Sequence, residues 1–163
     1  MTGDAPAPTD GTAGRSIEPG QHVFSRLNIQ EAPPRRGTFA MQLDVGPHVV
    51  NNRGGLQGGL VATLADVAAG CALMYDLPPG KSAATADLNM HFLSAVTEGP
   101  ALADVMVVRR GKRTIVVQVE IFDVGRDVLC AIATLTFSLL DLRPGQREIR
   151  TQLQETVEQE EPK

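Results

Sequence analysis

The amino-acid sequence predicts an α+β domain in which one long helix lies inside a curled antiparallel sheet. Residues 60–75 form a run in which all residues but Thr63 and Asp66 are small or hydrophobic, as expected for a helix that is buried on all sides. Before this run, residues 38–45 alternate between apolar and polar, the pattern of a half-buried strand. After it, apolar segments rich in β-branched residues follow one another between short turns. A helix without a polar face must be covered by the sheet that these strands form.

The chain divides into three parts. Residues 1–20 carry four glycines, several prolines and few apolar residues, so we expect a disordered leader. Residues 21–140 are long enough for one domain, which begins with a brief helix over residues 21–30. The strands after the long helix are expected as successive hairpins at residues 84–96, 102–110, 114–122 and 128–140. Residues 141–163 form a polar tail, either frayed and disordered or docked through a narrow apolar stripe.

Composition excludes several classes of function. The formal net charge of -4 gives no support to nucleic-acid binding. No apolar run of about 18 residues is free of charge, so we expect no membrane span. No secretory signal is visible at the N-terminus. Cys71 and Cys130 lie in apolar segments and are expected to be buried in a reducing, cytoplasmic environment. The isolated His22, His48 and His91 offer no metal-ligand spacing, so we expect no metal, and His91 is expected to be structural.

Asp66 is the anomalous residue of the predicted helix. A buried, unpaired carboxylate costs roughly several kcal/mol, and no basic residue lies within two turns of it. The preceding polar loop, residues 51–59, has four glycines in its last six positions. Its backbone can approach a ligand closely, and the N–H groups at the helix start favour negative charge. This combination predicts acyl transfer, against the alternative that Asp66 reaches solvent or hydrogen-bonds a neighbouring group.

Two motifs carry a family resemblance. They are Asn51-x-x-Gly54-x-x-Gln57-Gly58-Gly59 followed by Ala62-Thr63-Leu64-x-Asp66, and Thr85-x-x-Leu88-x-x-x-Phe92-Leu93. Together they resemble the hotdog-fold acyl-CoA thioesterases of the phenylacetic-acid-degradation type, over about residues 21–140. That family usually has a histidine before the Gly-Gly, where this chain has Gln57. Its amide can donate a hydrogen bond but cannot titrate.

The resemblance implies a hotdog fold with a five- to six-stranded sheet and hydrolysis of an acyl-CoA thioester to free acid and CoA, without a cofactor. It also implies a homodimer, often paired into a homotetramer, whose active sites span two protomers. Asn51, Gln57 and Gly58 would come from one chain, and Asp66 and Thr85 from the other. An open sheet edge supports dimerisation independently, because such an edge must be covered.

Roles for the catalytic candidates follow from the resemblance. The Gly58 N–H would receive the thioester oxygen, a contact worth roughly 2.7–4 kcal/mol in a dry site. Asp66 would act as general base on a water or as a nucleophile that forms a mixed anhydride. Thr85 would hold the water, or is a plain strand threonine. Gln57 would hydrogen-bond the carbonyl, and Asn51 either joins the site or caps a turn.

Coenzyme A carries phosphates, which basic side chains and helix-start amides bind. We expect contacts from Gly59 and from one basic cluster in a predicted hairpin, although a solvated turn is the alternative for the cluster. The basic cluster consists of Arg109, Arg110, Lys112 and Arg113.

Two rival functions are separable by residue type. Hotdog hydratases place a histidine five residues after the catalytic Asp, where this chain has Cys71, which argues against hydration. The second rival is a domain that binds acyl-CoA without turnover, as a sensor or carrier, and Gln57 keeps this alternative open.

Overall fold

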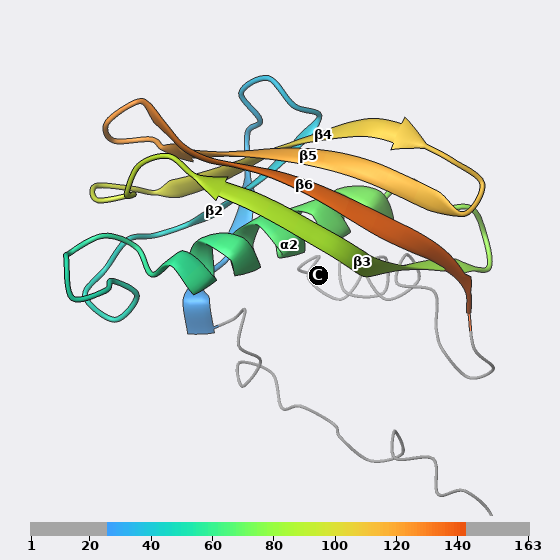
Figure 1. Ribbon diagram of the computed structural model, residues 1–163, viewed down its shortest axis with the longest axis horizontal. Helices are drawn as coiled ribbons and strands as arrows, with labels where there is room; N and C mark the ends of the chain where they lie inside the picture. The colour runs from blue at the N-terminus through green and yellow to red at the C-terminus, as the bar shows by residue number, and fades with distance from the viewer. Residues whose placement is uncertain (1–25, 143–163) are drawn as a thin grey trace, which may run out of the picture.

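The computed structural model describes residues 26–142 of the 163-residue chain. One long helix packs against one face of a six-stranded antiparallel sheet (Figure 1), which confirms the predicted fold class. The elements are β1 (Gln30–Ala32), β2 (Phe39–Leu43), α2 (Gly58–Met74), β3 (Lys81–Phe92), β4 (Ala101–Arg110), β5 (Thr114–Asp123) and β6 (Val128–Asp141). The predicted leader and the tail from residue 143 onward lie outside the described residues. No helix within residues 26–142 is long and apolar enough to cross a membrane.

The strand order is β1-β2-β4-β5-β6-β3, and it corrects the predicted run of successive hairpins. β3 pairs with β6 along its whole length, whereas β4 pairs with β2 and β5. The prediction is wrong at the β3–β4 connection, because residues 93–100 carry the chain past the ends of β5 and β6 to the other side of the sheet. Sequential strands are neighbours in only about two-thirds of cases, and an eight-residue connection is long enough for the exception. β3 is therefore an edge strand within the described chain.

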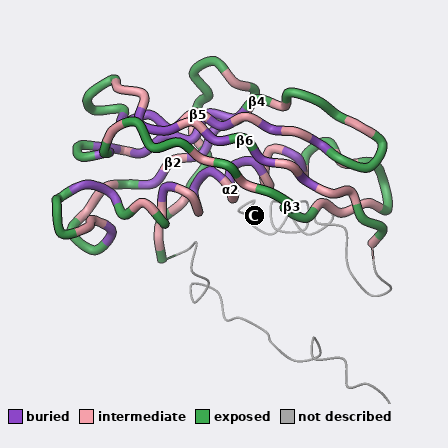
Figure 2. The backbone as a smooth tube through the Cα atoms, viewed as in Figure 1, coloured by how far each residue is buried: buried purple, intermediate pink, exposed green. Residues whose placement is uncertain are grey.

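The helix buries one side against the sheet. Its buried residues are Val61, Leu64, Ala65, Ala68, Ala69 and Leu73, which meet inward-facing aliphatic side chains of the central strands. The opposite side is half-buried or exposed and includes Gly59, Ala62, Asp66 and Gly70 (Figure 2). The expectation of a helix buried on all sides is therefore wrong for the single chain. The sheet wraps one side of the helix, and the small residues on the other side leave it open.

The first strand is absent from the sequence prediction, which extends a helix to Gln30. Arg26 and Leu27 are helical, but Asn28 has a positive φ of 51° and ends the helix. Gln30 then pairs with Gln42 of β2. Three residues are too few for an alternation pattern to show, so β1 carries no sequence signal.

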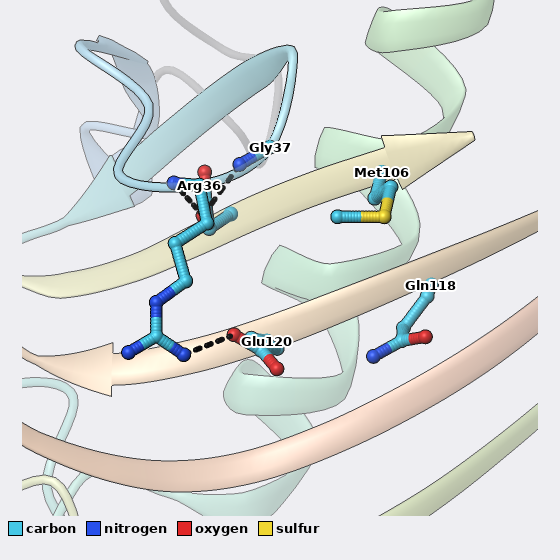
Figure 3. Close-up of a pocket in the computed structure, with 6 residues that line it drawn as sticks. Arg36, Gly37, Met106, Gln118 and Glu120 are labelled. Carbon is cyan, nitrogen blue, oxygen red and sulfur yellow. Dashed lines mark hydrogen bonds and ion pairs between the residues drawn. The ribbon is translucent and has the colours of Figure 1, made fainter. Parts of the chain in front are cut away.

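A buried carboxylate that the sequence prediction missed holds the β1–β2 loop. Asp104 of β4 is 4% exposed and accepts hydrogen bonds from the backbone N–H groups of Arg35, Arg36 and Gly37 at 3.1, 2.7 and 2.9 Å. Figure 3 shows two of these bonds at the small hollow beside Met106 and Gln118. The chain passes so close to β4 that a Cβ at Gly37 would lie 2.2 Å from the carbonyl oxygen of Val105.

Candidate functional site

Residues 51–59, which we call the glycine loop, are held by their own backbone. The N–H of Asn51 donates to the Gly55 carbonyl at 2.8 Å, and the N–H of Gly54 donates to the Asn51 carbonyl at 3.0 Å. The side-chain oxygen of Asn51 accepts the Arg53 N–H at 2.8 Å. This closes an Asx turn, so the turn-capping role considered for Asn51 is present in the structure. A direct role for Asn51 in the site stays a prediction.

The loop delivers two unpaired amides at the start of α2. The N–H of Leu56 donates to Val96 and that of Gln57 to Val49, while the Gln57 carbonyl accepts the first bonds of the helix. The N–H groups of Gly58 and Gly59 have no acceptor among residues 26–142. Such amides, at the positive end of the helix dipole, form a site for developing negative charge. The predicted position of Gly58 at the helix N-terminus is therefore confirmed. Its catalytic role stays a prediction.

An aromatic ring lies beside the first of these amides. A Cβ at Gly58 would be 3.7 Å from the ring of Phe92, the last residue of β3. Phe92 is 58% exposed, which is unusual for a phenylalanine. The Gln57 side chain is also exposed and forms no cap hydrogen bond to the helix. One apolar and one amide side chain thus flank the free N–H groups.

Asp66 and Thr85 meet between α2 and β3. The Thr85 hydroxyl donates a hydrogen bond of 2.8 Å to one carboxylate oxygen of Asp66. A register shift in the β3–β6 ladder between Thr85 and Asp87 changes the alternation of side chains at this point. Asp66 is half-buried on the open side of the helix rather than enclosed, so the expectation of a deeply buried carboxylate is wrong for the single chain. The carboxylate keeps one oxygen without a side-chain donor among the described residues.

The two halves of the candidate site are separated within one chain. Asp66 follows Gly58 by eight residues, which is about 12 Å along a helix with a 1.5 Å rise per residue. A carbonyl carbon attacked near Asp66 cannot place its oxygen on the Gly58 amide of the same helix, because those two contacts must lie within about 3 Å of the reacting centre. The single chain therefore does not bring Gly58 and Asp66 to one reacting centre.

The predicted basic cluster lies at the opposite end of α2. Arg110, the last residue of β4, forms an ion pair of 3.1 Å with Asp76, just beyond the helix C-terminus. Arg109, Lys112 and Arg113 are exposed around the β4–β5 turn. Within the single chain, this cluster is separated from Gly58 by the 17-residue length of the helix.

An open groove of about 560 Å³, which the sequence did not predict, lies beside this cluster. Its walls include Phe39, Ala72, Tyr75 and Arg110. The Tyr75 hydroxyl donates a hydrogen bond to Glu31, and this bond, with burial and the charge of Glu31, raises the pKa of Tyr75 to about 12. The sequence signal for this groove is weak: Tyr75 is the chain's one tyrosine, placed at the helix end.

The two cysteines and His91 differ in how far they are buried. Cys130 is buried as expected, and burial raises the pKa of its thiol. Cys71 is half-buried, and burial followed by the charge of Glu31 raises its thiol pKa as well. His91 is exposed on β3, so the expectation of a packed structural histidine is wrong. Within the described chain, no three His, Cys, Asp or Glu side chains gather as a metal site would require.

The chain is similar in sequence and in structure to known proteins. The model of the thioesterase superfamily matches residues 54–130. The BH2602 protein from Bacillus halodurans, crystallised with CoA, is 32% identical, with a TM-score of 0.64 over 72% of this chain and 75% of that one. The candidate esterase SSO1253 of Saccharolobus solfataricus is 29% identical over 72% of this chain and 77% of its own length. A phenylacetic acid degradation-related protein from Ralstonia eutropha JMP134 is 24% identical, with a TM-score of 0.64 over 77% of this chain and 93% of that one.

A helix packed on a six-stranded antiparallel sheet of this order, with a free-amide loop at its N-terminus, defines a hotdog-fold protein. The chain belongs to the thioesterase superfamily.

Proposed function

We propose that this protein hydrolyses an acyl-CoA thioester to the free acid and CoA, with Asp66 as its catalytic carboxylate. The observation that carries the proposal is the hydrogen bond of 2.8 Å from Thr85 to Asp66 on the open side of the helix. It holds one carboxylate oxygen and leaves the other without a side-chain donor among the described residues. Membership of the thioesterase superfamily and the CoA-bound relative from Bacillus halodurans support the substrate class.

The complete site requires two protomers. The separation of about 12 Å between Gly58 and Asp66 means that a partner chain must supply the amide that faces this Asp66. β3 is an edge strand with exposed residues along much of its length, and pairing two such edges would bring a second copy beside Asp66 and Thr85. We therefore assign Asn51, Gln57 and Gly58 to one chain and Asp66 and Thr85 to the other. Pairing of such homodimers into a homotetramer, as in the phenylacetic-acid-degradation type, is part of the same proposal.

The chemistry follows from these positions. The thioester oxygen accepts hydrogen bonds from the Gly58 N–H and the Gln57 side-chain amide, which stabilise the negative charge of the tetrahedral intermediate. Asp66 removes a proton from a water that attacks the carbonyl carbon, or attacks that carbon itself to form an anhydride that water then opens. The C–S bond breaks, and the CoA thiolate leaves and takes up a proton. The Thr85 hydroxyl orients the carboxylate for either route.

The CoA moiety would lie across exposed basic groups. Gly59, whose N–H is free at the helix start, would bind a phosphate oxygen. Arg109, Lys112 and Arg113 have exposed side chains, and Arg110 retains further donors beside its ion pair with Asp76. Because the basic cluster and Gly59 lie at opposite ends of α2, a phosphate bound by both would have to bridge two protomers whose helices run antiparallel.

Thiol release from a panel of aryl, short, medium and long acyl-CoA thioesters tests the proposal. The native protein should release thiol, and Asp66→Asn should lose at least about a hundredfold in kcat, the usual contribution of a positioned acid–base group. Asp44→Asn is the matched control, because Asp44 is an exposed carboxylate whose side-chain partner among the described residues is the neutral Asn28. Chromatographic mass and circular dichroism should match among the three proteins.

A binding protein without turnover is the second candidate, and Gln57 is the observation that favours it, since an exposed amide cannot transfer a proton. It predicts that native protein and Asp66→Asn bind acyl-CoA equally while neither releases thiol. That result would contradict the hydrolase proposal.

A further inference from the structure

The connection between β3 and β4, residues 93–100, touches the glycine loop directly. We call it the crossover loop. The N–H of Leu56 donates a hydrogen bond of 2.8 Å to the carbonyl oxygen of Val96, whose side chain is buried in the core. Gly55 approaches so closely that a Cβ there would lie 3.0 Å from the Cβ of Ala95. The position of Val96 therefore sets the position of Leu56, two residues before the Gly58 amide.

Asp123, at the end of β5, holds the far half of the crossover loop. Its side chain is fully buried, and it accepts hydrogen bonds from the N–H groups of Thr97, Glu98 and Gly99 at 2.8, 3.2 and 2.8 Å. Three consecutive amides on one carboxylate leave the backbone of that segment little freedom. Val96 directly precedes this segment, so the bonds to Asp123 also restrict the position of Val96.

Arg126, in the β5–β6 turn, holds the near half. Its Nη1 atom donates to the carbonyl oxygen of Ala95 at 3.1 Å and to the hydroxyl of Thr97 at 3.3 Å, on either side of Val96. The same atom lies 3.8 Å from Oδ2 of Asp123, so the buried carboxylate is also its counter-ion. The Arg126 side chain is 34% exposed, so its guanidinium binds the crossover loop from the protein surface and is not part of the hydrophobic core.

We propose that Arg126, anchored by Asp123, is a positioning residue that sets the Gly58 amide at the place where the thioester oxygen binds. The route has three steps: Arg126 fixes the two residues that flank Val96, the Val96 carbonyl fixes the Leu56 N–H, and Leu56 fixes the start of α2. The proposal rests on the hydrolytic function proposed above. Neither side chain touches Gly58 or Asp66, so the effect is transmitted through the crossover loop alone.

Steady-state kinetics of Arg126→Ala give the first test. An amide that has moved loses contact with an oxygen whose charge develops in the transition state, so kcat should fall about tenfold while KM changes less than twofold. Thr97→Val, which removes one acceptor of the guanidinium and keeps the side-chain shape, should show a smaller fall of the same kind. Arg126→Lys, which keeps the charge and donors, should recover part of the loss. A native kcat in Arg126→Ala overturns the proposal.

The matched control is Arg36→Ala. The exposed side chain of Arg36 lies 4.0 Å from Glu120 at the surface hollow of Figure 3, and no residue of the glycine loop or the crossover loop lines that hollow. Its side chain is removed without loss of the backbone bonds to Asp104, so its kcat should equal that of the native protein. A fall in kcat as large as that of Arg126→Ala would show that any lost surface ion pair has the same effect, and would overturn the assignment.

Amide hydrogen exchange tests the coupling without reference to activity. In Arg126→Ala, the Leu56 N–H should exchange roughly tenfold faster, because its acceptor is no longer held, while core amides of β4 and β5 keep their native rates. Unchanged Leu56 exchange overturns the positioning proposal by itself. A native protein that releases no thiol contradicts the hydrolytic function by itself, so the two failures are distinguishable.

Discussion

The hydroxyl of Thr85 on β3 lies 2.8 Å from a carboxylate oxygen of Asp66 on α2 and joins the edge strand to the open side of the helix. A threonine at a strand edge needs no such partner, since water satisfies an exposed hydroxyl. The bond therefore selects one orientation of the carboxylate, and it does so at the point where the β3 ladder is irregular.

Removing this hydroxyl should impair catalysis more than folding. Thr85→Val keeps the β-branched shape and leaves Asp66 free to rotate, so we expect kcat for thioester hydrolysis to fall roughly tenfold or more. The free energy of unfolding should change by less than about 1 kcal/mol, because the bond is exposed to solvent. Thr85→Ser, which restores a hydroxyl, should recover most of the rate. Equal kcat in Thr85→Val and native protein would reduce Thr85 to a plain strand residue.

Asp123 should make the stability of the protein dependent on acid pH. Burial alone would raise the pKa of Asp123, but hydrogen bonds from the amides of Thr97, Glu98 and Gly99 hold it below its usual value. A folded-state pKa below the unfolded value of about 3.9 gives stability that is fully present above that value. This stability is lost as the pH falls through the folded-state pKa.

Asp123→Asn tests this pH dependence. An amide in place of the carboxylate loses charge-assisted bonds, so at neutral pH we expect the free energy of unfolding to fall by about 1–3 kcal/mol. The difference between native protein and Asp123→Asn should shrink as the pH falls below about 4. Urea unfolding at a series of pH values measures both. A difference that stays constant down to the acid limit of folding would show that the carboxylate charge is not what stabilises the crossover loop.

Two glycines should respond oppositely to alanine. Gly37→Ala places a Cβ 2.2 Å from the Val105 carbonyl oxygen, so the β1–β2 loop must move, and we expect a loss of about 3 kcal/mol or more. Gly70→Ala meets no atom within 4 Å in the single chain and lies inside α2, where alanine should add about 0.5–1 kcal/mol. Thermal and urea unfolding compare the two. A destabilised Gly70→Ala, accompanied by a change in oligomeric mass, would instead place a partner chain on this side of the helix.

The sequence predicts those features that local pattern determines. The alternation of residues 38–45, the apolar run around Asp66 and the turns between the later strands each produce the expected element within a few residues. The free amide of Gly58 is predictable too, because a glycine-rich loop that leads into a helix leaves its first N–H groups unpaired.

The features that the sequence prediction missed depend on contacts between distant segments. The crossover from β3 to β4 depends on Asp123 binding amides more than twenty residues away, and a lone aspartate at a strand end gives no sign of this. The open side of α2 is equally hidden, because apolar composition reports that a helix is covered but not whether its own chain or a second copy covers it.

Tyr75 offers a direct check of the groove at the end of α2. Because it is the one tyrosine in 163 residues, the ultraviolet absorbance of its phenolate titrates a single group. The hydrogen bond to Glu31, together with burial and the Glu31 charge, raises the pKa of Tyr75 to about 12, whereas a free tyrosine titrates near pH 10. A raised folded-state pKa means that the stabilisation is present below about pH 10 and is lost as the pH rises toward 12. Glu31→Gln should return the titration of Tyr75 toward 10, while Glu120→Gln, at a residue that pairs with Arg36 and does not line the groove, should leave it unchanged. An ordinary titration midpoint in the native protein would mean that Tyr75 and Glu31 are apart in solution and that the groove is open to solvent at that wall.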